Sequence, residues 1–187
     1  MRQYRFVTTW VLDAPIEDVF EAIRHSEAWP LWWRGVTHVE EIAPGDADGV
    51  GNLRRYTFCS LLPYALTFDM RTTRIEVPRR LDGEASGELV GVGRWELTPS
   101  NAGVVVRYEW EVGTSRAWMN LLSPLAGPVF AWNHNIIMRW GEEGLRARLG
   151  LPPREDTGDS ARRGRVRLLA MLGIAAVLAA LRLRWGR

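Results

Sequence analysis

The sequence predicts an α+β fold in which a curved antiparallel sheet of about seven strands is wrapped around a long C-terminal helix. About seven strand-like segments follow one another between residues 4 and 112, and turn residues separate them at hairpin-like spacing. One long helical pattern then covers Pro128–Leu149, with apolar residues on two adjoining faces. We expect a small-molecule cavity between this helix and the sheet.

The chain begins with one strand and two short helices. Alternate residues of Tyr4–Leu12 place aromatic and aliphatic side chains on one side of a strand. A helix is expected next, because Pro15 suits a first helical turn and the acidic Glu17 favours the positive end of a helix. Ser26 is expected to cap a second short helix that ends before Pro30.

Six further strands complete the predicted sheet. They are expected at Gly35–Ile42, Asn52–Cys59, Ala65–Glu76, Arg79–Ser86, Glu88–Thr98 and Val104–Val112. The last of them has the clearest alternation, with Val, Tyr and Trp on one side and Arg107, Glu109 and Glu111 on the other. One face of the sheet is therefore predicted to be packed and the other solvated.

The long helix contains two glycines and a polar pair. Gly141 and Gly144 each cost about 1 kcal/mol relative to Ala in a helix interior. We therefore expect the sheet to approach the helix closely at these two positions. Asn133 and His134 interrupt the apolar part of the helix, and we expect them to face the wider part of the cavity.

Charge is divided unevenly along the chain. Residues 1–150 contain 16 Arg and 19 acidic residues, a net charge of −3, whereas residues 151–187 contain 8 Arg and 3 acidic residues, a net charge of +5. Since the predicted domain has no basic excess, a nucleic-acid partner is not expected. Cys59 is the single cysteine, which excludes an internal disulfide and a cysteine-based metal site.

The order of these elements, together with four short motifs, resembles the START-like, helix-grip superfamily, often called SRPBCC. The motifs are DAPIEDVFEAI at Asp13–Ile23, AWPLWWRGV at Ala28–Val36, LPY at Leu62–Tyr64 and NHNIIMRWGEEGL at Asn133–Leu145. The last two resemble the bacterial branch described as polyketide cyclase/dehydrase and lipid-transport proteins. The resemblance covers residues 3–149.

This resemblance implies an apolar cavity and suggests its contents. Members bind lipids, sterols, polyketides or hormones, and some are aromatase/cyclases. The superfamily has no universal catalytic motif, so no catalytic residue can be transferred to this chain, and no cofactor is implied. Fold-level analogy is in any case a poor guide to chemistry.

Residues on the inner faces of the strands and of the long helix are the candidate ligand contacts. They are Tyr56, Phe68, Met70, Trp95, Tyr108 and Trp110 from the strands and Phe130, Asn133, His134 and Ile137 from the helix. The alternative is a filled core, which ten tryptophans could also build. No metal site is expected, because His25 and His38 have no partner at ligand spacing.

The C-terminal tail predicts two more segments after a ligand-binding domain at residues 1–149. Residues 150–165 are rich in Pro, Gly and charge, which indicates a disordered linker. Residues 166–185 contain the 14-residue run Leu168–Leu181 without a polar side chain, flanked by Arg. That run covers roughly 21 Å of a bilayer core of about 30 Å, and its flanks can close most of the gap. We predict a membrane anchor that holds the domain on the cytoplasmic side; docking on protein or self-association is the alternative.

The sequence thus favours binding or transfer of a hydrophobic, lipid-like or polyketide-like molecule by a non-enzymatic protein tethered to the membrane. The alternative is a cyclase, dehydrase or hydrolase acting on a polyketide-like or lipid substrate, with His134 as acid/base, since its reference pKa lies near 6.5. A third interpretation is a stress or scaffold protein with a vestigial cavity. The sequence specifies neither the ligand nor the oligomeric state.

Overall fold

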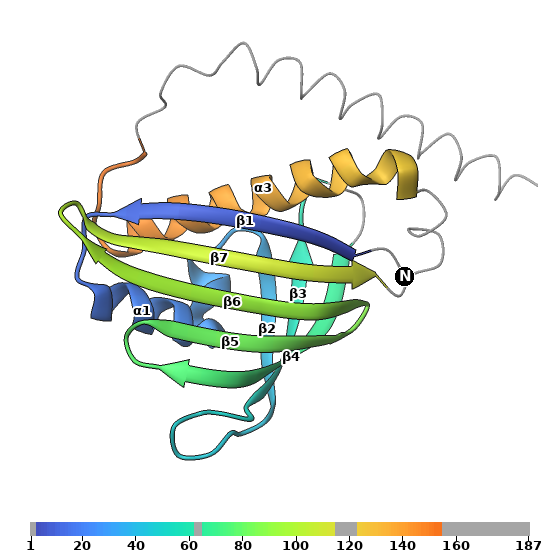
Figure 1. Ribbon diagram of the computed structural model, residues 1–187, viewed down its shortest axis with the longest axis horizontal. Coiled ribbons are helices and arrows are strands. Elements are labelled where there is room, and N and C mark those ends of the chain that lie inside the picture. The colour runs from blue at the N-terminus through green and yellow to red at the C-terminus, as the bar shows by residue number, and fades with distance from the viewer. Residues whose placement is uncertain (1–2, 62–64, 115–122, 155–187) are drawn as a thin grey trace, which may run out of the picture.

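A computed structural model describes residues 3–61, 65–114 and 123–154 (Figure 1). The strands are β1 (Gln3–Leu12), β2 (Val36–Ala43), β3 (Leu53–Cys59), β4 (Ala65–Glu76), β5 (Arg80–Gly87), β6 (Leu89–Ser100) and β7 (Gly103–Thr114). The helices are α1 (Ile16–Arg24), the 3-10 helix η1 (Ser26–Leu31) and α3 (Ser123–Arg148). The predicted α+β class is therefore confirmed, and each of the seven predicted strands overlaps an observed one.

The seven strands form one antiparallel sheet in the order β1-β7-β6-β5-β4-β3-β2. Neighbours in the chain are neighbours in the sheet from β2 to β7, and β1 pairs with β7 in unbroken register from Gln3 opposite Gly113 to Leu12 opposite Val104. In Figure 1, β2–β4 turn away from the direction of β1, β7 and β6, so the sheet is strongly bent. The bend gives the sheet a concave inner face.

Helix α1 covers one end of the inner face. Three of its apolar side chains, Val19, Phe20 and Ile23, are at most 1% exposed. They join Trp10 and Leu12 of β1 in the core. Burial of a side chain of this size stabilises the fold by about 1.5–3 kcal/mol, so α1 closes the sheet at this end.

The second short helix differs from the prediction in two respects. It is a 3-10 helix that continues past Pro30 to Leu31, and the Trp29 carbonyl oxygen accepts hydrogen bonds from the N–H groups of both Trp32 and Trp33. In so short a helix most N–H groups have no helical partner. The missing N–H of Pro30 therefore costs the helix little in hydrogen bonding. Ser26 does not cap this helix; its hydroxyl bonds to the distant Tyr56.

Helix α3 is longer at its start than predicted, since it begins at Ser123 and includes Pro124 and Pro128. Pro124 lies in the first turn, where the backbone N–H would have no helical partner in any case. The helix ends at Arg148, one residue before the predicted end. Figure 1 shows α3 running alongside β1.

The two glycines of α3 meet a neighbour closely, but the neighbour is not the sheet. A Cβ atom at Gly144 would overlap the carbonyl oxygen of Trp32, and one at Gly141 would lie 2.5 Å from the Trp33 ring. The Trp33 indole N–H also donates a 2.8 Å hydrogen bond to the Ile137 carbonyl oxygen. The predicted close approach is therefore confirmed, and its partner is the Trp32–Trp33 segment that follows η1.

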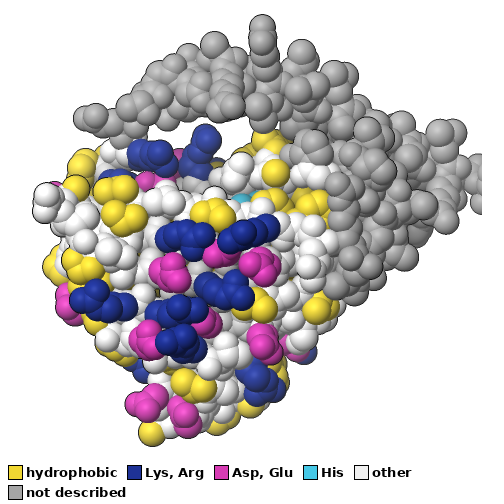
Figure 2. All heavy atoms as spheres, viewed as in Figure 1, with side chains coloured by type: hydrophobic (Ala, Val, Ile, Leu, Met, Phe, Trp, Pro, Cys, Tyr) yellow, Lys and Arg dark blue, Asp and Glu magenta, His cyan; other side chains and the backbone are white. Residues whose placement is uncertain are grey.

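The outer face of the sheet carries mixed charge, as Figure 2 shows for the side formed by β1, β7, β6 and β5. Glu109 lies between Arg5 and Arg107, and both guanidinium groups pair with its carboxylate. The hydrogen bond from Arg5 is the main cause that lowers the pKa of Glu109. A second cross-strand pair joins Arg94 and Glu111 at 3.3 Å. The predicted division into a packed and a charged face is thus confirmed on β7.

Helix α3 ends at Arg148, and the domain boundary at residue 149 stays a prediction. Beyond it, Arg154 still contacts the helix through a 2.9 Å ion pair with Glu142, which is 3% exposed. The rest of the predicted linker and the predicted membrane anchor at residues 166–185 lie outside the described residues. Within the described ranges, no helix is long and apolar enough to cross a membrane.

Candidate functional site

A pocket of about 180 Å³ lies on the inner face of the sheet, against η1 and α3. Since roughly 15 Å³ of such space accommodates one water molecule, it has room for a small organic molecule. The ten candidate ligand contacts all line it: Tyr56, Phe68, Met70, Trp95, Tyr108, Trp110, Phe130, Asn133, His134 and Ile137. That these side chains bind a ligand stays a prediction.

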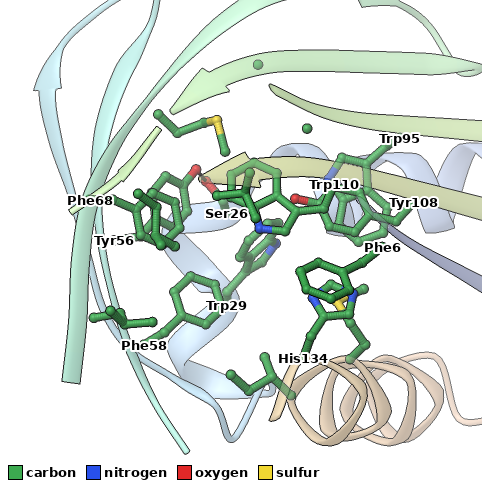
Figure 3. A pocket seen from close by; sticks show the side chains of 18 of the residues that line it. Phe6, Ser26, Trp29, Tyr56, Phe58, Phe68, Trp95, Tyr108, Trp110 and His134 are labelled. Atoms are coloured by element: carbon green, nitrogen blue, oxygen red, sulfur yellow. Dashed lines mark hydrogen bonds between the residues drawn. The ribbon is translucent and has the colours of Figure 1, made fainter. Parts of the chain in front are cut away.

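Aromatic rings from neighbouring strands form the floor of the pocket (Figure 3). Trp95 of β6 lies opposite Tyr108 of β7, and their rings stack with centroids 4.0 Å apart. Tyr56 of β3 lies opposite Phe68 of β4, and these rings stack at 5.9 Å. The antiparallel register therefore turns alternate aromatic residues of the sequence into a continuous apolar surface.

Trp29 and Trp33 add to this surface from the segment around η1, and sequence reasoning did not include them among the ligand contacts. Trp29 packs against Tyr56 with ring centroids 5.6 Å apart, and Trp33 packs against Phe58 at 6.1 Å. Both tryptophans are also core residues, since Trp29 is 7% and Trp33 is 2% exposed. A high tryptophan content could build either a filled core or a pocket wall, and these two residues belong to both.

A polar cluster lies at the end of the pocket next to η1. The hydroxyl groups of Ser26 and Tyr56 are 2.7 Å apart, and Arg54 donates a 2.9 Å hydrogen bond to the Ser26 oxygen. Arg54 also pairs with Glu27 at 3.1 Å, so its charge is compensated. Burial raises the pKa of Tyr56, which keeps its hydroxyl neutral at physiological pH.

Arg54 is a charged strand residue, but it does not lie on the solvated face of the sheet. Its side chain is 19% exposed and lines the pocket, whereas the next residue, Arg55, pairs with Asp69 at 2.7 Å and is 46% exposed. The strand period could have shown this, because Arg54 lies two residues before Tyr56 and therefore on the same face of β3, and Tyr56 was predicted to point inward. Position along the strand was a better guide here than side-chain charge.

His134 lies on the α3 side of the pocket. Its Nε2 atom is 3.3 Å from the Thr8 hydroxyl oxygen, and its ring stacks on Phe6 with centroids 4.6 Å apart. Burial lowers the pKa of His134 to about 4, because a charged imidazolium is poorly solvated there. His134 is therefore neutral at physiological pH and faces the pocket rather than bulk solvent.

Two further polar side chains belong to the pocket wall. Asn133 is 7% exposed, and its Oδ1 atom accepts no hydrogen bond within the part of the chain that the structure describes. The hydroxyl of Tyr108 faces the backbone of Gly93, and burial raises its pKa. Across residues 3–61, 65–114 and 123–154, no three His, Cys, Asp or Glu side chains come together as a metal site would require.

A bent seven-stranded antiparallel sheet, a long C-terminal helix and a pocket between them define a START-like, helix-grip protein. The family described as polyketide cyclase/dehydrase and lipid transport matches residues 3–150, and the chain belongs to this family. The resemblance inferred from the sequence motifs is thereby confirmed. No curated protein matches the chain.

Solved structures agree in fold. The Zhui aromatase/cyclase from Streptomyces sp. R1128 aligns with a TM-score of 0.66 at 12% identity, covering 80% of this chain and 94% of that one. A START superfamily protein from Mycobacterium smegmatis aligns with a TM-score of 0.62 at 12% identity, covering 79% and 97%. The protein TTHA0849 from Thermus thermophilus aligns with a TM-score of 0.62 at 17% identity, covering 79% and 99%. Identities this low support the shared fold and no shared activity.

Proposed function

We propose that this protein binds a hydrophobic small molecule in the pocket and carries or presents it without chemical change. The observation that supports this most directly is the continuous aromatic lining of the pocket. Its rings come from β3, β4, β6, β7 and the η1 segment. Ligand sites are mostly apolar with a few placed polar groups, which is the composition of this pocket. Membership of a family that includes lipid transport is consistent with it.

The state of His134 favours binding over catalysis. A general acid or base works best when its pKa lies near the working pH. A pKa of about 4 makes His134 a weak base, and it is not protonated to the imidazolium that could act as a general acid at neutral pH. Its polar neighbour is the hydroxyl of Thr8. No carboxylate is within hydrogen-bond distance to raise its basicity among the described residues.

An enzyme of the cyclase or dehydrase type is the second candidate. One of the structures with the same fold is an aromatase/cyclase. The polar side chains of Asn133, His134 and Tyr108 line the pocket of this protein. These groups could orient the carbonyl groups of a polyketide-like substrate. Turnover of such a substrate by the wild type, lost in His134→Phe, would decide in favour of this candidate.

Native mass spectrometry of the full chain tests the binding proposal. We expect a co-purified hydrophobic molecule on the wild type and its loss in Ile137→Trp, which fills the pocket from α3. Ile136→Trp is the matched control, because Ile136 is the adjacent residue of α3 and does not line the pocket. A wild type that carries no such molecule, and takes up none when incubated with hydrophobic compounds, contradicts the proposal.

We further propose that residues 166–185 tether the domain to the cytoplasmic face of the membrane. The supporting observation is the run of 14 residues without a polar side chain between two groups of Arg. Fractionation of the full chain against a chain ending at Gly150 tests it. The full chain should sediment with membranes and the shortened chain should not, and a full chain that stays out of the membrane fraction refutes the tether.

A further inference from the structure

The side-chain amide of Asn133 has a buried oxygen without a hydrogen-bond partner among the described residues. The residue is 7% exposed and lines the pocket. Buried amides are normally hydrogen-bonded, since leaving one unpaired costs free energy. A pocket-wall amide in this state is matched by a ligand that reaches it and supplies the missing hydrogen bond.

The second unsatisfied atom lies at the opposite end. Arg54 uses its terminal nitrogens for Ser26, Glu27 and Glu41, but its buried Nε has no partner in the described part of the chain. Figure 3 shows His134, the neighbour of Asn133, across the aromatic floor from the Ser26–Tyr56 pair. Polar groups thus lie at two ends of a surface made of rings.

Charge in the pocket wall is compensated. The guanidinium group of Arg54 lies 3.1 Å from one carboxylate and 3.6 Å from another, so an incoming anion would meet a cation that is already paired. Arg24 pairs with Glu21 at 3.6 Å, and Asp82 pairs with Arg80 at 3.0 Å. Each of these charged side chains therefore already has a partner of opposite sign.

Three further titratable groups of the pocket wall add no charge at neutral pH. Burial keeps His134, Tyr56 and Tyr108 in their neutral forms. An organic anion entering this pocket would lose its hydration and gain no free cation in the described wall, which is unfavourable.

We propose that the ligand is a neutral, ring-containing molecule whose hydroxyl or carbonyl group bonds to the Asn133 amide, and that free fatty acids and other organic anions are excluded. This inference rests on the proposed function, because it specifies what the same pocket binds. Stacked aromatic walls suit flat rings, which offer large contact areas at low entropic cost. Asn133 is therefore a specificity-determining residue that can accept from a hydroxyl or donate to a carbonyl.

Isothermal titration calorimetry of the full chain at pH 7.5 tests the inference with three probes of equal ring size. The probes are 2-naphthol, which carries a hydroxyl group, 2-methylnaphthalene, which carries a methyl group of similar volume, and 2-naphthoate, which is an anion. For each protein we compare the ratio of the dissociation constants of the naphthol and the methyl compound. When this ratio is compared between the wild type and a variant, the different hydrophobicities of the two probes cancel.

Asn133→Leu is the informative variant and Asn135→Leu is its control. Leu is close to Asn in size and cannot form the hydrogen bond, and Asn135 is an exposed residue of the same helix. We expect Asn133→Leu to shift the ratio about tenfold towards the methyl compound, and Asn135→Leu to leave it unchanged. Naphthoate should bind the wild type at least tenfold more weakly than naphthol. If Asn133→Leu does not fold, Asn133→Ala replaces it.

The possible outcomes distinguish the role of Asn133, the exclusion of anions and the proposed function. A ratio that Asn133→Leu leaves unchanged overturns the role of Asn133, and naphthoate binding as tightly as naphthol overturns the exclusion of anions. In both cases the pocket still binds hydrophobic rings, so the proposed function survives. A wild type that binds none of the three probes refutes the proposed function, and this inference falls with it.

Discussion

Gly144 of α3 is the position where one added methyl group should disturb the fold most clearly. A Cβ atom there would overlap the carbonyl oxygen of Trp32 and lie 2.8 Å from its carbonyl carbon. These are backbone atoms, so a rotamer change cannot relieve the overlap and the helix or the Trp32–Trp33 segment must move. Overpacking of this kind costs typically 1–3 kcal/mol or more, against a gain of about 1 kcal/mol in helix propensity. We therefore expect Gly144→Ala to lower the free energy of unfolding by about 2 kcal/mol.

Gly127 provides the matched control within the same helix. A Cβ atom at Gly127 would be 3.8 Å from the Tyr4 ring, which is an ordinary van der Waals contact. Gly127→Ala should therefore change the free energy of unfolding by less than about 1 kcal/mol, because the gain in helix propensity is opposed by Pro128, which disfavours the helical conformation of a preceding residue that has a Cβ atom. Urea unfolding followed by tryptophan fluorescence measures both, and thermal unfolding should place Gly144→Ala roughly 4–8 °C below the wild type. Equal stability of the two Ala variants would refute the contact between α3 and Trp32.

Two further predictions concern the polar groups of the pocket. Since burial lowers the pKa of His134 from 6.5 to about 4, the unfolded chain takes up a proton between pH 6.5 and 4 that the folded protein does not, and stability falls as the pH falls through this window by on the order of 3 kcal/mol. His134→Asn should show a shallower loss over the same range in urea unfolding, and an identical pH profile would contradict a buried neutral imidazole. Tyr56→Phe should cost about 1 kcal/mol of stability, because it removes the 2.7 Å hydrogen bond to Ser26. In a double-mutant cycle with Ser26→Ala the two losses should be less than additive, and simple additivity would show that the hydroxyl groups do not interact.

The residues that the sequence placed correctly are those whose role follows from a local period. In β7, Tyr108 and Trp110 were expected to face inward because every second residue of the strand is apolar, and both line the pocket. Asn133 and His134 were found by the same reasoning at the helical period, as polar positions on an otherwise apolar face. Such patterns require only that one face of an element is buried, which a single sequence can show.

The residues that the sequence misplaced depend on contacts between distant parts of the chain. The cap predicted for Ser26 is a local signal, but its hydroxyl bonds to Tyr56, 30 residues away. The close approach at Gly144 was readable from the energetic cost of a helical glycine, whereas its partner, Trp32, was not. The free-energy cost of a glycine in a helix indicates that a close contact exists there. Only the packing of the whole fold determines which segment makes that contact.

The position of α3 couples the packing at Trp32 to the pocket. Gly144 lies outside the pocket wall, and Asn133 lies 11 residues before it, which is about 16 Å along the helix axis. A helix pushed away from Trp32 at one end must tilt or shift at the other, where Asn133 and His134 meet the ligand space. Gly144→Ala should therefore weaken binding of 2-naphthol although it removes no pocket atom, while Gly127→Ala should not weaken it. If calorimetry finds unchanged affinity in a destabilised Gly144→Ala protein, the pocket end of α3 is held by its own contacts with β1, such as that between His134 and Thr8.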